Sequence, residues 1–111
     1  MGQFVKGDVV VVPFPFSDLT SSKRRPALVV ATLPGDDVIL CQITGRTKSD
    51  GYSVPITPAD CHSGTLHRQS NVRPNRLFTG DSKIIRYRAF VLSSAKVQEV
   101  VAKIIQILTS P

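Results

Sequence analysis

Short apolar runs separated by turn-forming residues make up the first part of the chain. The first run, GDVVVVPF, is rich in β-branched residues, a composition typical of a strand, and Pro13 and Pro15 are expected to end it. Two further apolar runs, 26–31 and 38–43, flank the turn residues 34–37 (PGDD). This spacing predicts an antiparallel hairpin.

Polar segments and weaker strand signals follow the hairpin. Residues 16–25 and 44–51 are polar and are expected to form loops, whereas 52–56 has the composition of a short strand. The stretch 66–79 carries two strand-like pieces, and Pro74 restricts one of them to an edge or a bend.

In the last part of the chain, the apolar residues recur with a helical period. Apolar residues recur there at spacings of three and four, which places them on one stripe of a helix. They are Val97, Val100, Val101, Ile104, Ile105 and Leu108. Ser93 or Ser94 is positioned to cap this helix. The stripe is expected to pack on the sheet, although the same spacing also suits a helix that binds a partner protein.

These elements predict a mainly β fold with one C-terminal helix. The strands are expected to form a small, strongly bent barrel or open sheet, with the helix across one end. At 111 residues the chain has room for one hydrophobic core, and no repeat or linker divides it. We therefore expect a single domain over residues 1–111.

Charge adds a preference for acidic partners. Lys and Arg number 14 against 8 Asp and Glu, which gives a formal net charge of +6. Such an excess favours polyanions such as nucleic acid or an anionic membrane surface. No window approaches the eighteen or so consecutive apolar residues of a membrane-spanning helix, and no apolar signal core follows the first cation. A cytoplasmic protein without a membrane partner is expected.

The remaining reactive residues do not form a recognisable catalytic or metal motif. Cys41 and Cys61 lie outside any CxxC arrangement and lack histidines at zinc-ligand spacing. His62 and His67 share a loop-like stretch without the Ser or Cys arrangement of a hydrolase, although either is chemically suited to move a proton. Neither a metal nor a cofactor is expected.

The segment KRRPALVV, residues 23–30, places three cations at the mouth of an apolar strand. Arginine binds phosphate through a planar fork and can stabilise charge that builds on a phosphate under attack. RNA carries its own nucleophile, the 2′-hydroxyl, so an enzyme can cleave it by positioning and charge neutralisation. Arg25 is the candidate residue to neutralise the charge on the phosphate. The alternative is that the three cations only keep a loop soluble.

The order of motifs resembles the MazF/PemK family of toxins from bacterial toxin-antitoxin pairs. The matching pieces are GDVVVVPFPFSDLTSSKRRPALVV, VILCQIT, GTLHRQSNVRP and the terminal amphipathic helix. This resemblance covers nearly the whole chain. It implies a small SH3-like barrel of the CcdB/MazF type, a homodimer, and a metal-independent endoribonuclease that cuts single-stranded RNA at short sequences.

The resemblance also implies which residues act. The family's essential arginine, immediately before a proline of the second strand, falls on Arg25, and its threonine at the end of the third strand falls on Thr44. Cations and an aromatic residue nearby are candidates for RNA binding. These are Phe16, Lys23, Arg24, Arg46, Lys48 and Arg73. Arg68, Arg76, Phe14 and Tyr52 are further possible contacts outside this primary set.

Two further expectations concern partners and alternatives. The resemblance implies an antitoxin whose acidic, partly disordered tail covers Arg25 and Thr44. The loop before Arg25 reads TSSKR where many members carry glycine, so its RNA contacts are expected to differ. Because the same fold serves CcdB-like proteins that poison DNA gyrase, the alternative function is a non-catalytic gyrase-poisoning or nucleic-acid-binding barrel.

Overall fold

A computed structural model describes residues 3–15, 22–46 and 50–111, with side chains from 3–13, 24–46 and 50–111. Seven strands and one α-helix form within these ranges. They are β1 (Asp8–Pro15), β2 (Ser22–Thr32), β3 (Asp37–Thr44), β4 (Val54–Ile56), β5 (Cys61–Gly64), β6 (Ser70–Asp81), β7 (Tyr87–Leu92) and α1 (Ser94–Thr109). Two short 3-10 turns, η1 (Pro58–Asp60) and η2 (Ser82–Ile84), join strands.

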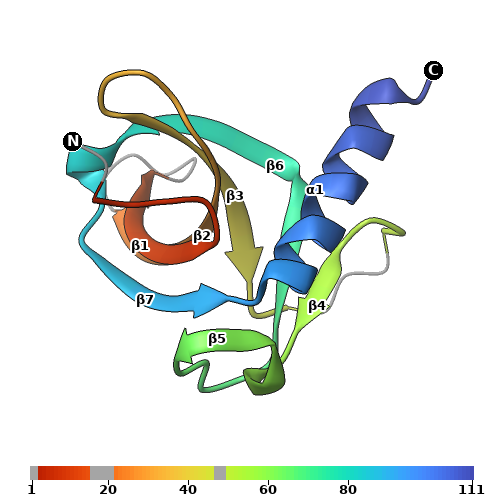
Figure 1. The fold of residues 1–111 in the computed structure, drawn as a ribbon, viewed down its shortest axis with the longest axis horizontal. Coiled ribbons are helices and arrows are strands. Elements are labelled where there is room, and N and C mark those ends of the chain that lie inside the picture. Colours follow the sequence, from red (N-terminus) through yellow and green to blue (C-terminus); the bar gives the residue numbers. More distant parts are fainter. Residues whose placement is uncertain (1–2, 16–21, 47–49) are drawn as a thin grey trace.

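The strands form one curled antiparallel sheet in the order β4-β6-β3-β2-β1-β7-β5. Figure 1 shows the sheet turning back on itself around β1 and β2, with α1 lying beside β6 and β4. The predicted hairpin of the second and third strands is present, since β2 and β3 are antiparallel neighbours. The mainly β fold with a C-terminal helix is therefore confirmed.

Strand alternation divides the buried residues between the two faces of the sheet. On β3, Cys41 and Ile43 belong to a cluster on the helix-side face, which also holds Val97 and Val100 of α1. Residues of opposite parity form a cluster on the second face. Its buried members are Val10, Val12, Ala27, Val29, Val38 and Leu40. Full burial of such side chains stabilises the fold by about 1.5–3 kcal/mol each, so both faces hold the strands rigidly.

The helix forms where the apolar stripe predicts it. Ser93 is the N-cap, and its Oγ accepts a hydrogen bond from the Lys96 amide at 3.3 Å. Val97, Val100 and Ile104 are buried against the sheet. The C-terminal part of the stripe is different, because Leu108 remains 71% exposed and Ile105 55%.

Strand β2 begins earlier than the apolar pattern predicts. Lys23, Arg24 and Arg25 belong to the strand and pair with Phe14, Pro13 and Val12 of β1, so the expectation of a loop up to residue 25 is wrong. Likewise, β1 runs through Pro13 to Pro15. The pairing of β1 with β7 stops at Val11, so Pro13 lies where β1 has become an edge strand and its missing N–H is tolerated.

Three other predictions need correction. The two strand-like pieces of 66–79 are one strand, β6, in which Pro74 is accommodated at an irregularity. Strand β5 lies where a loop-like stretch around His62 was expected. Strand β7 has no counterpart among the predicted elements, because Arg86 just before it and Arg88 within it interrupt the apolar pattern.

Candidate functional site

The register of β2 and β3 brings the two predicted catalytic residues together. Ala27 pairs with Gln42 at the end of the β2–β3 ladder, and Arg25 and Thr44 each lie two residues beyond that pair. Alternation puts both side chains on the second face, just beyond the last apolar residues of its cluster. The buried strands therefore carry a guanidinium and a hydroxyl to the same end of the sheet.

Arg25 and Thr44 line a pocket of about 540 Å³, here called the arginine pocket. Five arginines contribute to its lining. They are Arg25, Arg46, Arg68, Arg73 and Arg76. The other lining residues are Gln42, Ile43, Thr44 and Gly45. Because an arginine side chain stays protonated and only donates hydrogen bonds, such a lining is suited to phosphate oxygens.

A bulge in β6 brings two of these arginines to the same pocket. Ile43 pairs with Val72 and Cys41 pairs with Leu77, so residues 73–76 of β6 all lie opposite Gln42 alone. In a regular strand, positions 73 and 76 would point to opposite faces, because their separation is odd. The extra residues change the direction of the strand locally, as bulges beside functional sites commonly do.

Hydrogen bonds hold the chain directly after Thr44. The Arg46 amide donates to Thr44 Oγ1 at 3.2 Å, and Asn71 Nδ2 donates to the Arg46 carbonyl at 3.0 Å. Since Thr44 Oγ1 accepts a hydrogen bond from one side, its own proton can be donated to an oxygen in the pocket. The loop thereby orients the Thr44 hydroxyl at the pocket that Arg25 also lines.

An ion pair holds Arg73 at the pocket wall. Its Nη2 lies 3.3 Å from Asp50 Oδ2, and the arginine side chain is only 12% exposed. Partial burial acts to raise the pKa of the Asp50 carboxyl. Hydrogen bonds from Ser53 and Tyr52, together with the charge of Arg73, outweigh that effect and hold this pKa below its ordinary value. Asp50 thus stays ionised and fastens the end of the loop to β6.

The cysteine beside the site is structural. Cys41 Sγ donates to the Arg73 carbonyl at 2.9 Å from a fully buried position. Burial raises the pKa of this thiol to about 12, although the neighbouring Arg73 opposes the shift. Cys41 therefore remains protonated at neutral pH and is unsuited to act as a nucleophile.

The pocket contains four of the eight predicted site residues, namely Arg25, Thr44, Arg46 and Arg73. Arg24 is exposed and is absent from the pocket lining, because its neighbouring position on β2 faces away from that of Arg25. The side chain of Lys23 lies outside the described residues, as do Phe16 and Lys48.

Sequence reasoning did not commit to three lining residues, Gln42, Arg68 and Arg76. The two arginines were candidates on charge alone, whereas Gln42 carried no signal of its own. Alternation from Thr44 identifies Gln42 once the strand is known, since i and i−2 share a face. The position of Arg76 depends on the bulge, which no residue pattern predicts.

Neither His62 nor His67 is among the described residues that line the arginine pocket. His62 lines a separate pocket of about 390 Å³ with Lys6 and the start of α1. Neither histidine nor any carboxylate lines the arginine pocket in the described part of the chain. Among these residues, no group of three or more His, Cys, Asp or Glu is placed to hold a metal ion. None of the described helices is long and apolar enough to cross a membrane.

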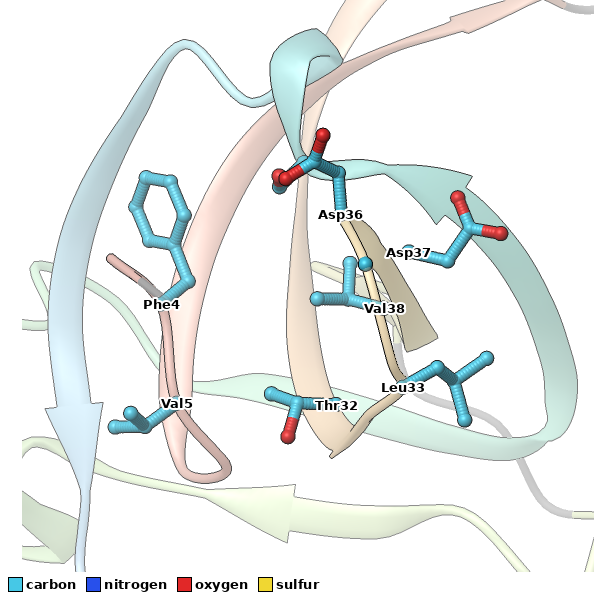
Figure 2. Close-up of a pocket in the computed structure, with 9 residues that line it drawn as sticks. Phe4, Val5, Thr32, Leu33, Asp36, Asp37 and Val38 are labelled. Atoms are coloured by element: carbon cyan, nitrogen blue, oxygen red, sulfur yellow. The ribbon is translucent and has the colours of Figure 1, made fainter. Parts of the chain in front are cut away.

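A third pocket, of about 240 Å³, lies at the opposite end of β3. Figure 2 shows Phe4, Val5 and Val38 around this hollow, with the carboxylates of Asp36 and Asp37 at its edge. Asp37 also pairs with Asp81 of β6. This acidic end holds no arginine among its described lining residues.

Comparison with known proteins places this architecture. A MazE–MazF complex from Deinococcus radiodurans has 20% sequence identity and a TM-score of 0.77, over 97% of both chains. An endoribonuclease in complex with its cognate antitoxin from a mycobacterial species has 15% identity and a TM-score of 0.76, again over 97% of both chains. The Mycobacterium tuberculosis toxin MazF-mt6 has 16% identity and a TM-score of 0.72, over 94% of this chain and 98% of that one.

These structural likenesses confirm the predicted MazF-type fold. No curated protein sequence matches the chain. The sequence profile of PemK-like, MazF-like toxins of type II toxin-antitoxin systems does match, over residues 5–108. Since that match spans nearly the whole chain, the protein belongs to the PemK-like, MazF-like family of type II toxins.

Proposed function

We propose that the protein is an endoribonuclease toxin that cleaves single-stranded RNA at selected sequences without a metal ion. One observation carries this proposal: Arg25 and Thr44 line the same pocket, which has five arginines in its lining. Family membership supports the toxin assignment, and one of the similar structures is described as an endoribonuclease.

The chemistry uses the RNA's own 2′-hydroxyl. Its oxygen attacks the adjacent phosphorus while its proton passes to water, the bond to the 5′-oxygen breaks, and that oxygen takes up a proton from water. The products carry a 2′,3′-cyclic phosphate and a 5′-hydroxyl. Charge builds on the non-bridging oxygens in the pentacoordinate transition state. The Arg25 guanidinium neutralises that charge, and the Thr44 hydroxyl donates a further hydrogen bond. Arg25 does not serve as the base, because arginine stays protonated throughout.

The remaining arginines are suited to hold the strand on either side of the cleaved phosphate. Arg46 and Arg68 are exposed at the pocket, whereas Arg73 is held in its wall by Asp50. Contacts of this kind are electrostatic and independent of sequence, so they supply affinity and orientation.

The direct test incubates purified protein with a long RNA in excess chelator and maps new 5′-hydroxyl ends. We expect cuts at a limited set of sequences. Arg86→Ala is the matched control for substitutions of the pocket arginines, because Arg86 is an exposed arginine outside the arginine pocket. Intact RNA after incubation with wild-type protein would contradict the proposal.

A non-catalytic nucleic-acid-binding or gyrase-poisoning barrel is the alternative, because arginine-lined pockets also suit simple binding. Thr44→Val separates the two functions. The substitution removes the hydroxyl but keeps a β-branched side chain, and the pocket arginines that hold the phosphates are unchanged, so RNA binding should remain while cleavage falls. Equal toxicity of wild type and Thr44→Val in cells would favour the non-catalytic function.

The partners we propose are an antitoxin and a second copy of the chain. Similar structures include toxins bound to a cognate antitoxin. An acidic antitoxin tail is complementary to the arginine pocket and would compete there with RNA. A two-fold dimer would extend the single short pocket into a longer path. Light scattering of the purified protein tests the dimer, and competition between the tail peptide and uncleavable RNA tests the shared site.

A further inference from the structure

A smaller cavity of different character lies beside the arginine pocket. This second cavity has a volume of about 200 Å³ and is lined by Gln42, Arg76, Leu77 and Phe78. Gln42 and Arg76 line both cavities, so the two are neighbours that share these side chains. Leu77 and Phe78 follow the β6 bulge directly and supply apolar surface that the arginine pocket lacks there.

The two cavities favour different parts of a nucleotide. Guanidinium groups only donate hydrogen bonds, which suits phosphate oxygens. Apolar surface beside a phosphate would instead cost solvation without a compensating contact. A nucleobase has apolar faces and a polar edge, so it matches a cavity that combines Leu77 and Phe78 with the Gln42 amide. The volume is also below the roughly 300–1,000 Å³ of pockets for drug-sized ligands, consistent with a single ring system.

Gln42 has the chemistry and the placement to distinguish bases. Its amide both donates and accepts, whereas the five arginines of the larger pocket cannot accept. It lies two residues before Thr44 on the same face of β3, and it is half-buried rather than free in solvent. A base read by Gln42 would therefore lie next to the phosphate held between Arg25 and Thr44.

We propose that the cavity formed by Gln42, Arg76, Leu77 and Phe78 is a nucleobase subsite, and that Gln42 determines specificity there. This inference rests on the proposed ribonuclease function, because RNA supplies both the phosphate and the base. A side-chain amide makes paired hydrogen bonds to the amino group and ring nitrogen of adenine. We therefore expect a preference for adenine at one position next to the cleaved bond. Arg76 bridges the two cavities and orients the nucleotide between them.

The test measures base preference with and without cleavage. A randomised RNA pool with 2′-O-methyl sugars lacks the nucleophile, so sequences retained by the protein report binding alone. A normal RNA pool with mapped 5′-hydroxyl ends reports cut sites. Both pools are examined with wild type, Gln42→Glu and Gln42→Asn. Gln106→Glu is the matched control, because it adds the same charge on the exposed surface of α1.

Gln42→Glu turns an amide that donates and accepts into a group that only accepts, and Gln42→Asn shortens its reach. We expect each to change the preference at one position by roughly five- to 150-fold, the range for a good paired contact to a base. The control should reproduce the wild-type preference. Melting curves confirm that each variant is folded, and Gln42→Asn keeps the test valid if the buried charge of Gln42→Glu disrupts the strand.

Two results would overturn the subsite. One is a wild-type protein that retains 2′-O-methyl RNA without any base preference. The other is a folded Gln42→Asn protein with the wild-type preference in both pools. If the 2′-O-methyl pool shows a base preference that depends on Gln42 but the normal RNA pool stays uncut, the subsite is supported and the nuclease assignment is removed. Failure of the subsite and failure of the nuclease function are therefore distinguishable.

Discussion

The two ends of strand β3 are joined by one row of side chains on the second face, but one end is acidic and the other is lined by arginines. Val38 begins the row of second-face residues at the acidic end, beside Asp36 and Asp37, and Thr44 ends it in the arginine pocket. The net charge of +6 is therefore an average over a polarised molecule. A buried strand fixes which residues emerge at each end, and the local charge there decides what binds.

The two ends of β3 also differ in which groups hold the adjoining turn or loop. At the acidic end, backbone groups close a tight turn: the Leu33 amide donates to the Asp37 carbonyl at 3.0 Å, and the Ser82 amide donates to the Asp36 carbonyl at 2.7 Å. Gly35 adopts a positive φ of 83° there, which glycine tolerates best. At the arginine end, side chains such as Asn71 hold the departing loop. Backbone hydrogen bonds therefore satisfy the turn at the acidic end, whereas the loop at the other end leaves arginine side chains as donors in the pocket.

The largest expected effect comes from removing the Arg25 charge from the arginine pocket. Arg25→Ala should lower RNA cleavage by about a hundred- to a thousand-fold, the usual loss for one donor to transition-state charge. Arg25→Lys should restore only part of the rate, because a point charge lacks the planar fork. Single-turnover cleavage rates and melting temperatures of the variants provide the measurement. A full rate in folded Arg25→Ala would remove Arg25 from the mechanism.

The next largest effect concerns binding at the same end. Arg46→Gln combined with Arg68→Gln should weaken RNA binding and reduce the slope of log affinity against log salt by about 0.7 for each lost phosphate contact. Both residues are exposed at the pocket, so stability should change little. Affinity for uncleavable RNA at several salt concentrations checks this. An unchanged slope would place the RNA outside the arginine pocket.

A smaller effect is expected on stability from the ion pair of Asp50 and Arg73. The pKa of Asp50 is lowered in the folded state, so its contribution is present above the unfolded value of about 3.9 and is lost as pH falls through the folded pKa. Asp50→Asn should lower the melting temperature at pH 7, and its difference from wild type should shrink below about pH 4.

The acidic end supplies the control for that measurement. Asp37→Asn removes a carboxylate from an exposed position. Its melting temperature should differ little from wild type at pH 7, in contrast to Asp50→Asn. Equal losses in the two variants would show that the contact with Arg73 is not what stabilises the loop.

The smallest effect is expected from neutralising the acidic end. Asp37 and Thr44 are the two ends of β3, so a rise of about 3.3 Å per residue separates them by roughly 23 Å. That is more than two Debye lengths at physiological salt, where each is about 8 Å. Asp36→Asn with Asp37→Asn should therefore change RNA affinity by no more than about two-fold. A tenfold gain in affinity would show that RNA approaches both ends of the strand.

The sequence pattern predicted those elements that are determined by residues close together in the chain. The helical stripe from Val97 and the hairpin around residues 34–37 followed from period and turn residues alone. The start of β2 did not, because Lys23 to Arg25 are held in a strand by pairing with β1 rather than by their own propensity. Strand β7 was missed because Arg86 and Arg88 interrupt the apolar pattern at its start.

The candidate site divides in a similar way. Arg25 and Thr44 were predicted from the family resemblance, and both line the arginine pocket. Gln42 follows from Thr44 by strand alternation once β3 is known. Charge alone suggested Arg76, but its place beside Arg73 required the three-dimensional structure, because the β6 bulge brings position 76 to that side.

The role of the 2′-hydroxyl tests the central claim most directly. Once a cut site is mapped, a short RNA containing that sequence is synthesised with a single 2′-deoxy sugar on the 5′ side of the cleaved bond. The protein should bind this RNA with the affinity of the unmodified strand and leave it intact, while the all-ribose control is cut to a 2′,3′-cyclic phosphate and a 5′-hydroxyl. Cleavage of the modified strand at the same bond and rate would contradict the account, because Arg25 and Thr44 would then not be acting on attack by the RNA's own hydroxyl.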